Sequence, residues 1–502
     1  MKLKNLLHTL NKKEFYGDEN IEISSIVIHS KNAYRKSLFV AIPGLKADGH
    51  DFLEDAYSKG ARAFVTQKPF KRPGAANIIV PDSRAALPLL AAEFYNQPSK
   101  SLKLIGITGT NGKTTTAFLV ESILKEAGSP VGLLSTIEYR FESHTRFAEC
   151  TTPDQIDLQR LFREMVDAGT RYVVMEVSSH GLKQRRVENC HFDVGVFTNL
   201  SPEHLDYHGT MDDYYLSKER FFTEILKKSS KKNKAAVINQ DDPTGSLLMK
   251  RTKCQTISFG LSRGDIQARN IQLSLTGTKA DIITKNKNFP VTSKLIGTFN
   301  LYNILAAIAT SMFLKIPTAV IKTGIEKAPG IPGRMERIEN DKEILIFVDY
   351  AHTGDALENV LKTLKKVGAG KIITVFGCGG DRDREKRPAM GRIAASYSEA
   401  VILTSDNPRT EEPEQIINEI EKGVLGKGFS KAENCSALRS REKVYFVFKD
   451  RRTAIQNGIS LAKPSDVVLI AGKGHETYQQ RGDEKIHFDD REEARRALKM
   501  CA

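Results

Sequence analysis

Short apolar runs recur along the chain, and each is followed at once by a polar, glycine-rich segment. Runs of this length that are rich in Val and Ile, with helical patterns between them, predict buried parallel strands. The runs span residues 104–107, 172–177, 194–198, 235–239, 344–348, 372–376, 401–404 and 467–471. Ligands bind at the carboxyl ends of strands in open α/β sheets, so the segments after the runs are candidate binding loops. The predicted fold class is therefore α/β.

The length of the chain predicts more than one domain. A chain of 502 residues is too long for one hydrophobic core, and roughly two to four domains are expected. The PSKS segment at 98–101 precedes the first strong strand, and the segment 325–338 holds two prolines and two glycines, which is typical of a hinge. We therefore expect an N-terminal domain over 1–100, a central domain over 101–333 and a C-terminal domain over 334–502.

Composition excludes several classes of protein. Hydrophobic residues make up 40% and charged residues 27%, as in ordinary globular proteins, and no apolar stretch approaches the length of a bilayer span. The basic N-terminus lacks an apolar core and a small-residue cleavage site, so we expect no signal peptide, no membrane partner and a cytoplasmic protein. The cysteines form no CxxC pair, which fits a reducing compartment. They are Cys150, Cys190, Cys254, Cys378, Cys435 and Cys501.

The charge balance indicates a polyanionic ligand. The formal net charge is +14, which suits either a nucleic acid or a nucleotide-like small molecule. Basic runs are short, as at Lys227-Lys228 and Lys231-Lys232, and no aromatic–basic stacking motif accompanies them. We therefore expect no nucleic-acid partner. A basic P-loop ATPase that binds nucleic acid stays open as an alternative, and its binding would fall steeply with salt.

A glycine-rich turn at 108–114 follows the first strong strand and opens a helical pattern. Such a turn points backbone N–H groups at a phosphate, and the helix dipole adds partial positive charge there. Lys113 would reach the β- and γ-phosphates, and the Thr114 hydroxyl would bind Mg²⁺. The usual P-loop spacing requires glycine at position 107, where this chain has Ile107. The segment predicts ATP binding through a variant of that loop.

The segment TGTNGKTTT at 108–116 resembles the nucleotide loop of the Mur ligase family and of its relatives, the folylpolyglutamate and cyanophycin synthetases. Other segments resemble one amino-acid-adding branch of the Mur ligases in the same order, over nearly the whole chain. They are LFVAIPGLKADGHDF (38–52), EVSSHGL (176–182), NLSPEHLDYHGT (199–210), YYLSKERFF (214–222), GTFNLYNILAA (297–307), PGRMERI (332–338), VDYAHTGDAL (348–357), GCGGDRDREKRP (377–388), DNPR (406–409) and GKGHE (472–476). The resemblance implies a three-domain architecture, with a central P-loop-type, mostly parallel sheet and a C-terminal Rossmann-like domain.

The resemblance also implies a reaction. The branch attaches meso-2,6-diaminopimelate to UDP-N-acetylmuramoyl-L-alanyl-D-glutamate in peptidoglycan precursor synthesis. ATP first phosphorylates the D-glutamate carboxylate, because a free carboxylate is a poor electrophile, and the amine then attacks the acyl phosphate. Two anions must approach each other, so several cations are needed at once. ATP and Mg²⁺ are the expected cofactors, and we expect a monomer.

The resemblance implies roles for the residues that match the family's motifs. The implied catalytic residues are Lys113, Glu176, His204 and Lys218. The implied ATP-binding residues are Gly109, Thr110, Asn111, Gly112, Lys113, Thr114, Thr115, Asn303, Arg334, Asp349 and His352. The implied Mg²⁺ ligands are Thr114, Glu176, His204 and Lys218, the last as a carbamate (N6-carboxylysine).

Two substrate sites follow from the same resemblance. Contacts to the UDP-linked dipeptide are implied for Ser30, Thr151, Thr152, Ser178, Gln184 and Arg186. Contacts to meso-diaminopimelate are implied for Arg382, Asp406, Asn407, Pro408, Arg409, Gly472 and Glu476. One residue departs from the pattern: Gly354 stands where the family usually has proline, which predicts a looser loop.

The choice of amino acid depends on Arg409. Meso-diaminopimelate is lysine with an extra carboxylate on its far carbon, and a guanidinium matches that group best. Family members that add L-lysine typically lack arginine at this position, so diaminopimelate is favoured, with the lysine-adding homologue as the alternative. A folylpolyglutamate synthetase would leave the DNPR segment and the N-terminal domain unexplained.

Overall fold

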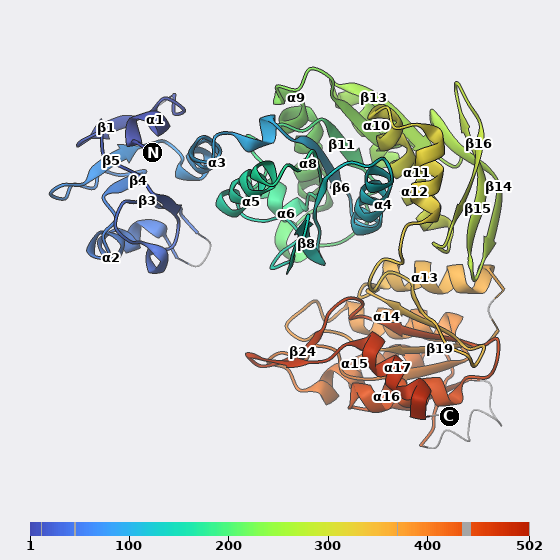
Figure 1. Ribbon diagram of the computed structural model, residues 1–502. Coiled ribbons are helices and arrows are strands. Elements are labelled where there is room, and N and C mark those ends of the chain that lie inside the picture. Colours follow the sequence, from blue (N-terminus) through green and yellow to red (C-terminus); the bar gives the residue numbers. More distant parts are fainter. Residues whose placement is uncertain (12, 45–46, 369, 434–442, 501–502) are drawn as a thin grey trace. The chain divides into compact units, whose positions relative to one another are not determined.

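The computed structural model describes residues 1–11, 13–44, 47–368, 370–433 and 443–500, so Cys435 and Cys501 lie outside the described residues (Figure 1). Contacts divide the chain into two compact units. One comprises 1–113, 124–259 and 308–316, and the other comprises 114–123, 260–307 and 317–502. Within the described part of the chain, no helix combines the length and apolar character needed to cross a membrane.

The first unit begins with a five-stranded sheet. Its order is β1-β5-β4-β3-β2, and only the β1–β5 pair is antiparallel. The strands are β1 (Glu14–Tyr16), β2 (Ser25–Val27), β3 (Ser37–Val40), β4 (Ala63–Thr66) and β5 (Ala76–Ile79). The accompanying helices are α1 (Leu3–Leu7), η1 (Ser30–Asn32), η2 (Gly49–Phe52), α2 (Leu53–Ser58), α3 (Ser83–Phe94) and η3 (Pro98–Lys100).

The central sheet of this unit is mostly parallel. Its parallel strands follow the order β13-β12-β11-β6-β10-β7, and the antiparallel β8 and β9 extend it beyond β7. The strands are β6 (Lys103–Thr108), β7 (Val131–Leu134), β8 (Glu138–Phe141), β9 (His144–Phe147), β10 (Tyr172–Glu176), β11 (Val194–Phe197), β12 (Ala235–Asn239) and β13 (Gln255–Gly260). The helices are α5 (Gln155–Asp167), α6 (Ser179–Lys183), α7 (Leu205–His208), α8 (Met211–Arg220), η4 (Phe221–Ile225), α9 (Leu226–Lys228) and α10 (Pro243–Arg251). The helix α4 (Lys113–Glu126) follows β6 along the chain, and its residues 114–123 belong to the second unit.

The second unit contains an antiparallel ladder and a parallel sheet. The ladder is β14 (Ile266–Ser274), β15 (Gly277–Thr284) and β16 (Phe289–Ser293), followed by α11 (Thr298–Phe313) and α12 (Thr318–Glu326). The sheet has the order β17-β18-β23-β19-β20-β22-β21, with only β17–β18 antiparallel. Its strands are β17 (Glu336–Ile338), β18 (Leu345–Asp349), β19 (Ile372–Phe376), β20 (Ala400–Leu403), β21 (Ser430–Lys431), β22 (Val444–Val447) and β23 (Val467–Ala471). A separate hairpin is formed by β24 (Tyr478–Arg481) and β25 (Glu484–His487).

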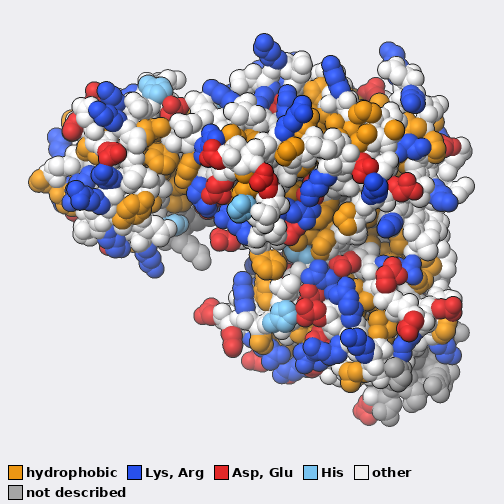
Figure 2. Space-filling view, in the orientation of Figure 1, with side chains coloured by type: hydrophobic (Ala, Val, Ile, Leu, Met, Phe, Trp, Pro, Cys, Tyr) orange, Lys and Arg blue, Asp and Glu red, His pale blue; other side chains and the backbone are white. Residues whose placement is uncertain are grey.

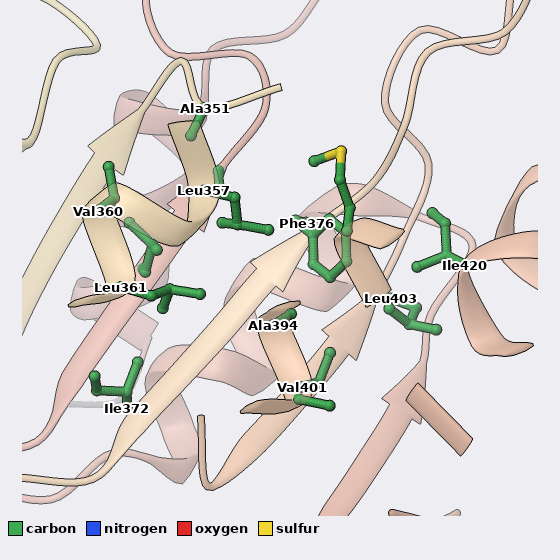
Figure 3. Packing of buried hydrophobic residues seen from close by; sticks show 14 of the residues in the cluster. Ala351, Leu357, Val360, Leu361, Ile372, Phe376, Ala394, Val401, Leu403 and Ile420 are labelled. Atoms are coloured by element: carbon green, nitrogen blue, oxygen red, sulfur yellow. The ribbon is translucent and has the colours of Figure 1, made fainter. Parts of the chain in front are cut away.

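Helices cover both faces of this C-terminal sheet. They are α13 (Gly354–Lys366), α14 (Lys386–Tyr397), α15 (Pro413–Leu425), α16 (Arg451–Leu461) and α17 (Asp490–Met500). On one face, Phe376 packs with Leu357 of α13 and Ile420 of α15 (Figure 3). On the other, Val375 packs with Ile455 of α16. Successive side chains of a strand point to opposite faces, so a strand buried on both sides reads as the continuous apolar run seen in the sequence.

All eight apolar runs form buried strands, and the α/β fold class is confirmed. The ends shift by one residue in several cases: β18 ends at Asp349 and β20 ends at Leu403, so the candidate site residues still stand at the carboxyl ends. The predicted hinge is the irregular segment between α12 and β17.

Gly354 lies at the start of a helix and not in an open loop. It is the first residue of α13, and the Thr353 side chain caps that helix by accepting a hydrogen bond from the Ala356 N–H. Proline is favoured at this first helical position, and Thr353 already has the extended backbone (φ −122°, ψ 158°) that a following proline requires.

Gly354→Pro should therefore stabilise the protein. Proline restricts the unfolded chain, and we expect a gain of about 0.5–1 kcal/mol. The nearest obstacle to a new Cβ is the flexible Ile393 Cδ1 at 3.1 Å. Equilibrium urea unfolding measures the change, with Gly368→Pro as the control because Gly368 has φ +81°, which proline cannot adopt. A loss of stability in Gly354→Pro would contradict the prediction.

Candidate functional site

The phosphate loop connects β6 to α4 in a conformation that needs glycine. Gly109 has φ +147°, and a Cβ there would lie 1.9 Å from Thr198 Oγ1. The loop is tied to the segment after β11: the Thr110 N–H donates to Asn199 O, and the Asn111 N–H donates to Asn199 Oδ1, both at 2.9 Å. Gly112 also has a positive φ, of 85°, immediately before the helix. The sequence 109–113 is thus held as a rigid turn at the N-terminus of α4.

Two lysine side chains meet at this loop. Lys113 Nζ donates to Gly109 O at 3.0 Å and to Thr110 O at 2.7 Å. Lys218 Nζ donates to the same Gly109 O at 2.9 Å. The structure therefore brings together two predicted catalytic residues that are far apart in the sequence, and it concentrates positive charge where a phosphate would bind.

Lys218 is buried in an unusual setting for an ammonium group. Its residue is 2% exposed, and its Nζ lies 4.4 Å from the centroid of the Tyr214 ring. Burial, reinforced by the nearby Lys113 charge, lowers the pKa of Lys218 well below its usual range. A larger fraction of this lysine is therefore the neutral amine, which is the nucleophilic form.

The position of Lys218 depends on a change of helix type. Lys218 lies near the end of α8, which continues directly into the π-helix η4. Phe221, the first residue of η4, packs against two glycines of the sheet: a Cβ would approach its ring within 2.6 Å at Gly106 and 3.1 Å at Gly195. These glycines on β6 and β11 let the helix approach the sheet closely beneath the phosphate loop.

Glu176 ends the strand next to β6. It pairs in register with Ile107 and is fully buried. Thr136 satisfies its carboxylate, with the backbone N–H donating to Oε1 at 2.9 Å and the hydroxyl to Oε2 at 3.1 Å. The carboxylate is thereby fixed at the carboxyl edge of the sheet, beside the strand that leads into the phosphate loop.

His204 stands just before α7 with a left-handed backbone of φ 58°. Burial lowers its pKa, and the charges of Lys113 and Lys218 lower it further, while Glu203 opposes the shift. A neutral imidazole is the form that binds metal ions. Among the described residues, no three His, Cys, Asp or Glu side chains converge into a ready-made metal site.

The residues expected to contact the UDP-linked dipeptide form one hydrogen-bonded group. The Thr152 hydroxyl donates to Glu176 O at 2.9 Å and accepts from the Ser178 N–H at 2.9 Å. Arg186 donates to Thr152 O at 2.6 Å and to Gln184 Oε1 at 3.0 Å. Thr151 joins the group through a 3.2 Å hydrogen bond between its hydroxyl and that of Thr136, which accepts because its own hydrogen is donated to Glu176. Ser30 belongs instead to η1, beside the first sheet.

In the second unit, Asn303 contacts the helix that follows the phosphate loop. The Thr116 hydroxyl of α4 donates to Asn303 Oδ1 at 3.4 Å, and Asn303 Nδ2 donates to Asn300 Oδ1 at 3.0 Å. Thr114 and Thr115 are buried at the start of the same helix. The structure thus places three of the expected ATP-binding residues on two neighbouring helices.

Asp349 contacts the irregular segment after α12. Its carboxylate accepts from the Met335 N–H at 2.7 Å and from the Ala351 N–H at 2.8 Å, and burial raises its pKa although Arg334 opposes this. The Arg334 guanidinium lies 4.6 Å from the Tyr350 ring centroid. His352 Nδ1 shares a 2.8 Å hydrogen bond with Tyr350 O. These residues form one cluster at the carboxyl end of β18.

The DNPR and GKGHE segments meet at the carboxyl ends of β20 and β23. Asn407 Nδ2 donates to Glu476 Oε2 at 2.8 Å, and Gly472 is so close to Asp406 that a Cβ would lie 2.6 Å from its Oδ2. Arg409 has a left-handed backbone and donates from Nη1 to Gly380 O at 2.6 Å.

Arg382 and Arg409 both border the loop after β19. A Cβ on Gly379 would lie 2.9 Å from Arg409 Nη1 and 3.9 Å from Arg382 Cγ. Arg382 is exposed, whereas Asn407 and Pro408 are buried. The structure thus brings two cationic side chains to the loop that contains Gly379.

Sequence reasoning missed three residues that organise these sites. Thr136 holds Glu176, Asn199 holds the phosphate loop, and Lys473 bridges Asn407 and Glu476. Each of the three lies within two residues of the end of a buried strand, so a position near a strand end was the available signal.

Charged side chains of both signs are mixed on the face of the protein shown in Figure 2, where Lys and Arg are interspersed with Asp and Glu. Many are paired with each other, as in the Arg160–Glu164 and Lys365–Glu399 contacts.

Sequence profiles of known families cover most of the chain. The profile "Mur ligase family, catalytic domain" matches residues 22–95, "Mur ligase middle domain" matches 107–311, and "Mur ligase, glutamate ligase domain" matches 333–474. The chain belongs to the Mur ligase family. As in other Mur ligases, three α/β parts follow one another along the sequence, and the chain is an ATP-dependent amide ligase.

Individual Mur ligases match over their full length. The UDP-N-acetylmuramoyl-L-alanyl-D-glutamate–2,6-diaminopimelate ligases of Geobacter metallireducens and Geobacter sulfurreducens are each 46% identical, over 99% and 98% of this chain and 98% of their own. A solved structure of a ligase with the same name matches with a TM-score of 0.71 and 31% identity, covering 100% of this chain and 99% of its own. A MurF ligase from Thermotoga maritima in complex with ADP shares the fold, with a TM-score of 0.62 and 20% identity.

Proposed function

We propose that this Mur ligase joins meso-2,6-diaminopimelate to UDP-N-acetylmuramoyl-L-alanyl-D-glutamate, with ATP converted to ADP and phosphate. One observation carries the proposal: relatives named for this reaction are 46% identical over essentially the whole chain. The preformed loop, the buried lysine and the two arginines beside Gly379 supply the groups that such a reaction needs.

The first step activates a carboxylate. An oxygen of the D-glutamate carboxylate attacks the γ-phosphorus of ATP, the bond to the β–γ bridging oxygen breaks, and ADP leaves. The backbone N–H groups of 109–113 would bind the phosphates, with Thr114, Thr115 and Asn303 on the adjoining helices. Lys113 would exchange its bonds to Gly109 O and Thr110 O for phosphate oxygens. Arg334, Asp349 and His352 would complete the nucleotide site.

Mg²⁺ would neutralise phosphate charge in this site. Its proposed ligands are Thr114, Glu176, His204 and the carbamate of Lys218. Three of the four groups supply the oxygen ligands that Mg²⁺ prefers, and His204 would add an imidazole nitrogen. Because Mg²⁺ keeps several waters and phosphate oxygens, a few protein groups suffice. The neutral amine of Lys218 can add to CO₂ with loss of a proton, which converts a buried cation into an oxygen-bearing anion.

The second step forms the amide. The amine of diaminopimelate attacks the acyl-phosphate carbonyl, a tetrahedral intermediate forms, and phosphate leaves as the C–O bond breaks. Arg382, Arg409, Asp406, Asn407, Pro408, Gly472 and Glu476 would bind the amino acid. Ser30, Thr151, Thr152, Ser178, Gln184 and Arg186 would bind the UDP-linked dipeptide.

The domain boundaries near 100 and 333 are part of this proposal. They are supported by the matched family segments, which end at 95 and 311 and resume at 107 and 333. A cytoplasmic monomer that uses ATP and a UDP-linked precursor is the simplest setting for the reaction.

The choice of amino acid is the test. Phosphate release should depend on UDP-N-acetylmuramoyl-dipeptide and on meso-diaminopimelate, and L-lysine should be a poor substitute because it leaves Arg409 unpaired. Arg409→Ala should reduce the preference for diaminopimelate by roughly 30-fold in kcat/KM, from a charge-pair loss of about 2 kcal/mol. Arg495→Ala, on α17, is the matched control. Equal use of both amino acids by the wild type would overturn the assignment.

A further inference from the structure

Lys473 is a buried cation with no role in the chemistry above. It stands between Gly472 and Gly474, two residues after the end of β23, and its side chain is 0% exposed. Its Nζ donates to Asn407 Oδ1 at 3.0 Å and to Glu476 Oε2 at 3.0 Å. The same Nζ lies 5.5 Å from the Tyr478 ring centroid. Lys473 therefore connects two residues of the amino-acid pocket.

The two hydrogen bonds fix the direction of the Asn407 amide. Asn407 Oδ1 accepts from Lys473 Nζ and from the Gln480 N–H at 2.9 Å, so the amide nitrogen must be on the other side. That nitrogen donates to Glu476 Oε2 at 2.8 Å. Rotation of the amide would place an N–H group against the Lys473 ammonium.

The same contacts leave one oxygen of Glu476 available. Oε2 accepts from both Asn407 and Lys473, and in the described part of the chain no hydrogen bond reaches Oε1. The Glu476 side chain is 18% exposed, whereas Lys473 beneath it is not exposed. A carboxylate held this way presents one acceptor of fixed direction to a bound amine.

Stability alone does not account for a lysine at this position. Removing an ammonium from water costs several kcal/mol. A protein in which an apolar side chain of similar volume replaces a buried charged one is often as stable or more stable. A buried charge that orients two polar groups of a binding pocket has a specific use: it preorganises them before the ligand arrives.

We propose that Lys473 is a positioning residue for the incoming amino acid, holding Asn407 and Glu476 so that Glu476 Oε1 accepts a hydrogen bond from an ammonium group of the diamino acid. The inference rests on the proposed function and adds a specificity element to the same pocket. Lys473 itself does not touch the substrate; it acts through Glu476 and Asn407.

Lys473→Met removes the charge and keeps the length of the side chain. We expect the KM for meso-diaminopimelate to rise about 10- to 100-fold, while kcat changes less and the KM values for ATP and the UDP-linked dipeptide stay within about twofold. Lys485→Met is the matched control, since Lys485 is exposed on β25 and its Nζ lies 4.3 Å from the same Tyr478 ring. Its KM values should not change.

A double-mutant cycle separates positioning from general damage. In a Glu476→Gln background the additional effect of Lys473→Met on the KM for diaminopimelate should fall below about threefold, because the group it positions is already lost. Equal effects in both backgrounds, or equal losses for all three substrates, would overturn the inference. If Lys473→Met alone does not fold, the KM for diaminopimelate is compared between Glu476→Gln and the double variant. A ratio of these two KM values larger than threefold would overturn the inference.

Failure of the proposed function would look different. It would appear as wild-type enzyme that forms no amide with diaminopimelate, whatever the variants do. Failure of the inference alone would leave wild-type turnover intact and the KM of Lys473→Met unchanged.

Discussion

Lys113→Ala should reduce acyl-phosphate formation by about a thousandfold or more. The variant removes the ammonium group that the phosphate loop holds over Gly109 O and Thr110 O, 3.0 and 2.7 Å away. Cations that offset charge in phosphoryl transfer account for losses of this size. Binding of the UDP-linked dipeptide should persist, because Thr152, Ser178 and Arg186 form a separate hydrogen-bonded group.

The measurement is phosphate release together with binding of the UDP-linked dipeptide by calorimetry. Lys125→Ala is the control, because Lys125 is exposed on the same helix α4. A Lys113→Ala variant that releases phosphate within threefold of the wild-type rate would disprove the role of this loop.

Lys218→Ala should be almost inactive, by about a thousandfold in kcat. Burial and Lys113 lower the pKa of Lys218, which favours the amine that reacts with CO₂, and the variant can form no carbamate. Formate or acetate should restore part of the activity, because a small carboxylate can occupy the space of the missing anion. Wild-type activity should also fall when dissolved CO₂ is removed.

The control for Lys218 is Lys227→Ala, an exposed lysine in α9 shortly after the same helix. Thermal unfolding shows whether the Lys218 variant is folded, since removing a buried side chain leaves a cavity. Full activity of Lys218→Ala, or no rescue by carboxylates in a folded variant, would show that no carbamate forms there.

Eight strands of the parallel sheets were predictable, but other parallel strands, such as β7 and β13, and several antiparallel strands were not. A strand buried on both faces, such as β19 or β23, needs apolar side chains at every position. The strands β9 and β14 are largely exposed, so their pairing depends on neighbouring strands rather than on an apolar pattern. Local sequence therefore carries little information about them.

The candidate site was predictable where one short segment supplies it. The phosphate loop is contiguous, and its glycines and Lys113 indicate its chemistry. Lys473 and Asn407 are 66 residues apart, and Thr136 and Glu176 are 40 apart. Such contacts depend on which strands become neighbours in the sheet, and the order of strands cannot be obtained from a motif.

The π-helix η4 contributes to the direction in which the Lys218 side chain points. A regular α-helix turns by about 100° per residue, so one residue more or fewer redirects every side chain on the far side of the change. The wide turn begins at Phe221, between the lysine and the rest of the helix, and Phe221 and Phe222 are both fully buried. The direction of the Lys218 side chain therefore depends on the number of residues in the π-helical turn as well as on their identity. A single-residue deletion between 223 and 225 would leave the segment 214–222 intact and still point the lysine away from the phosphate loop.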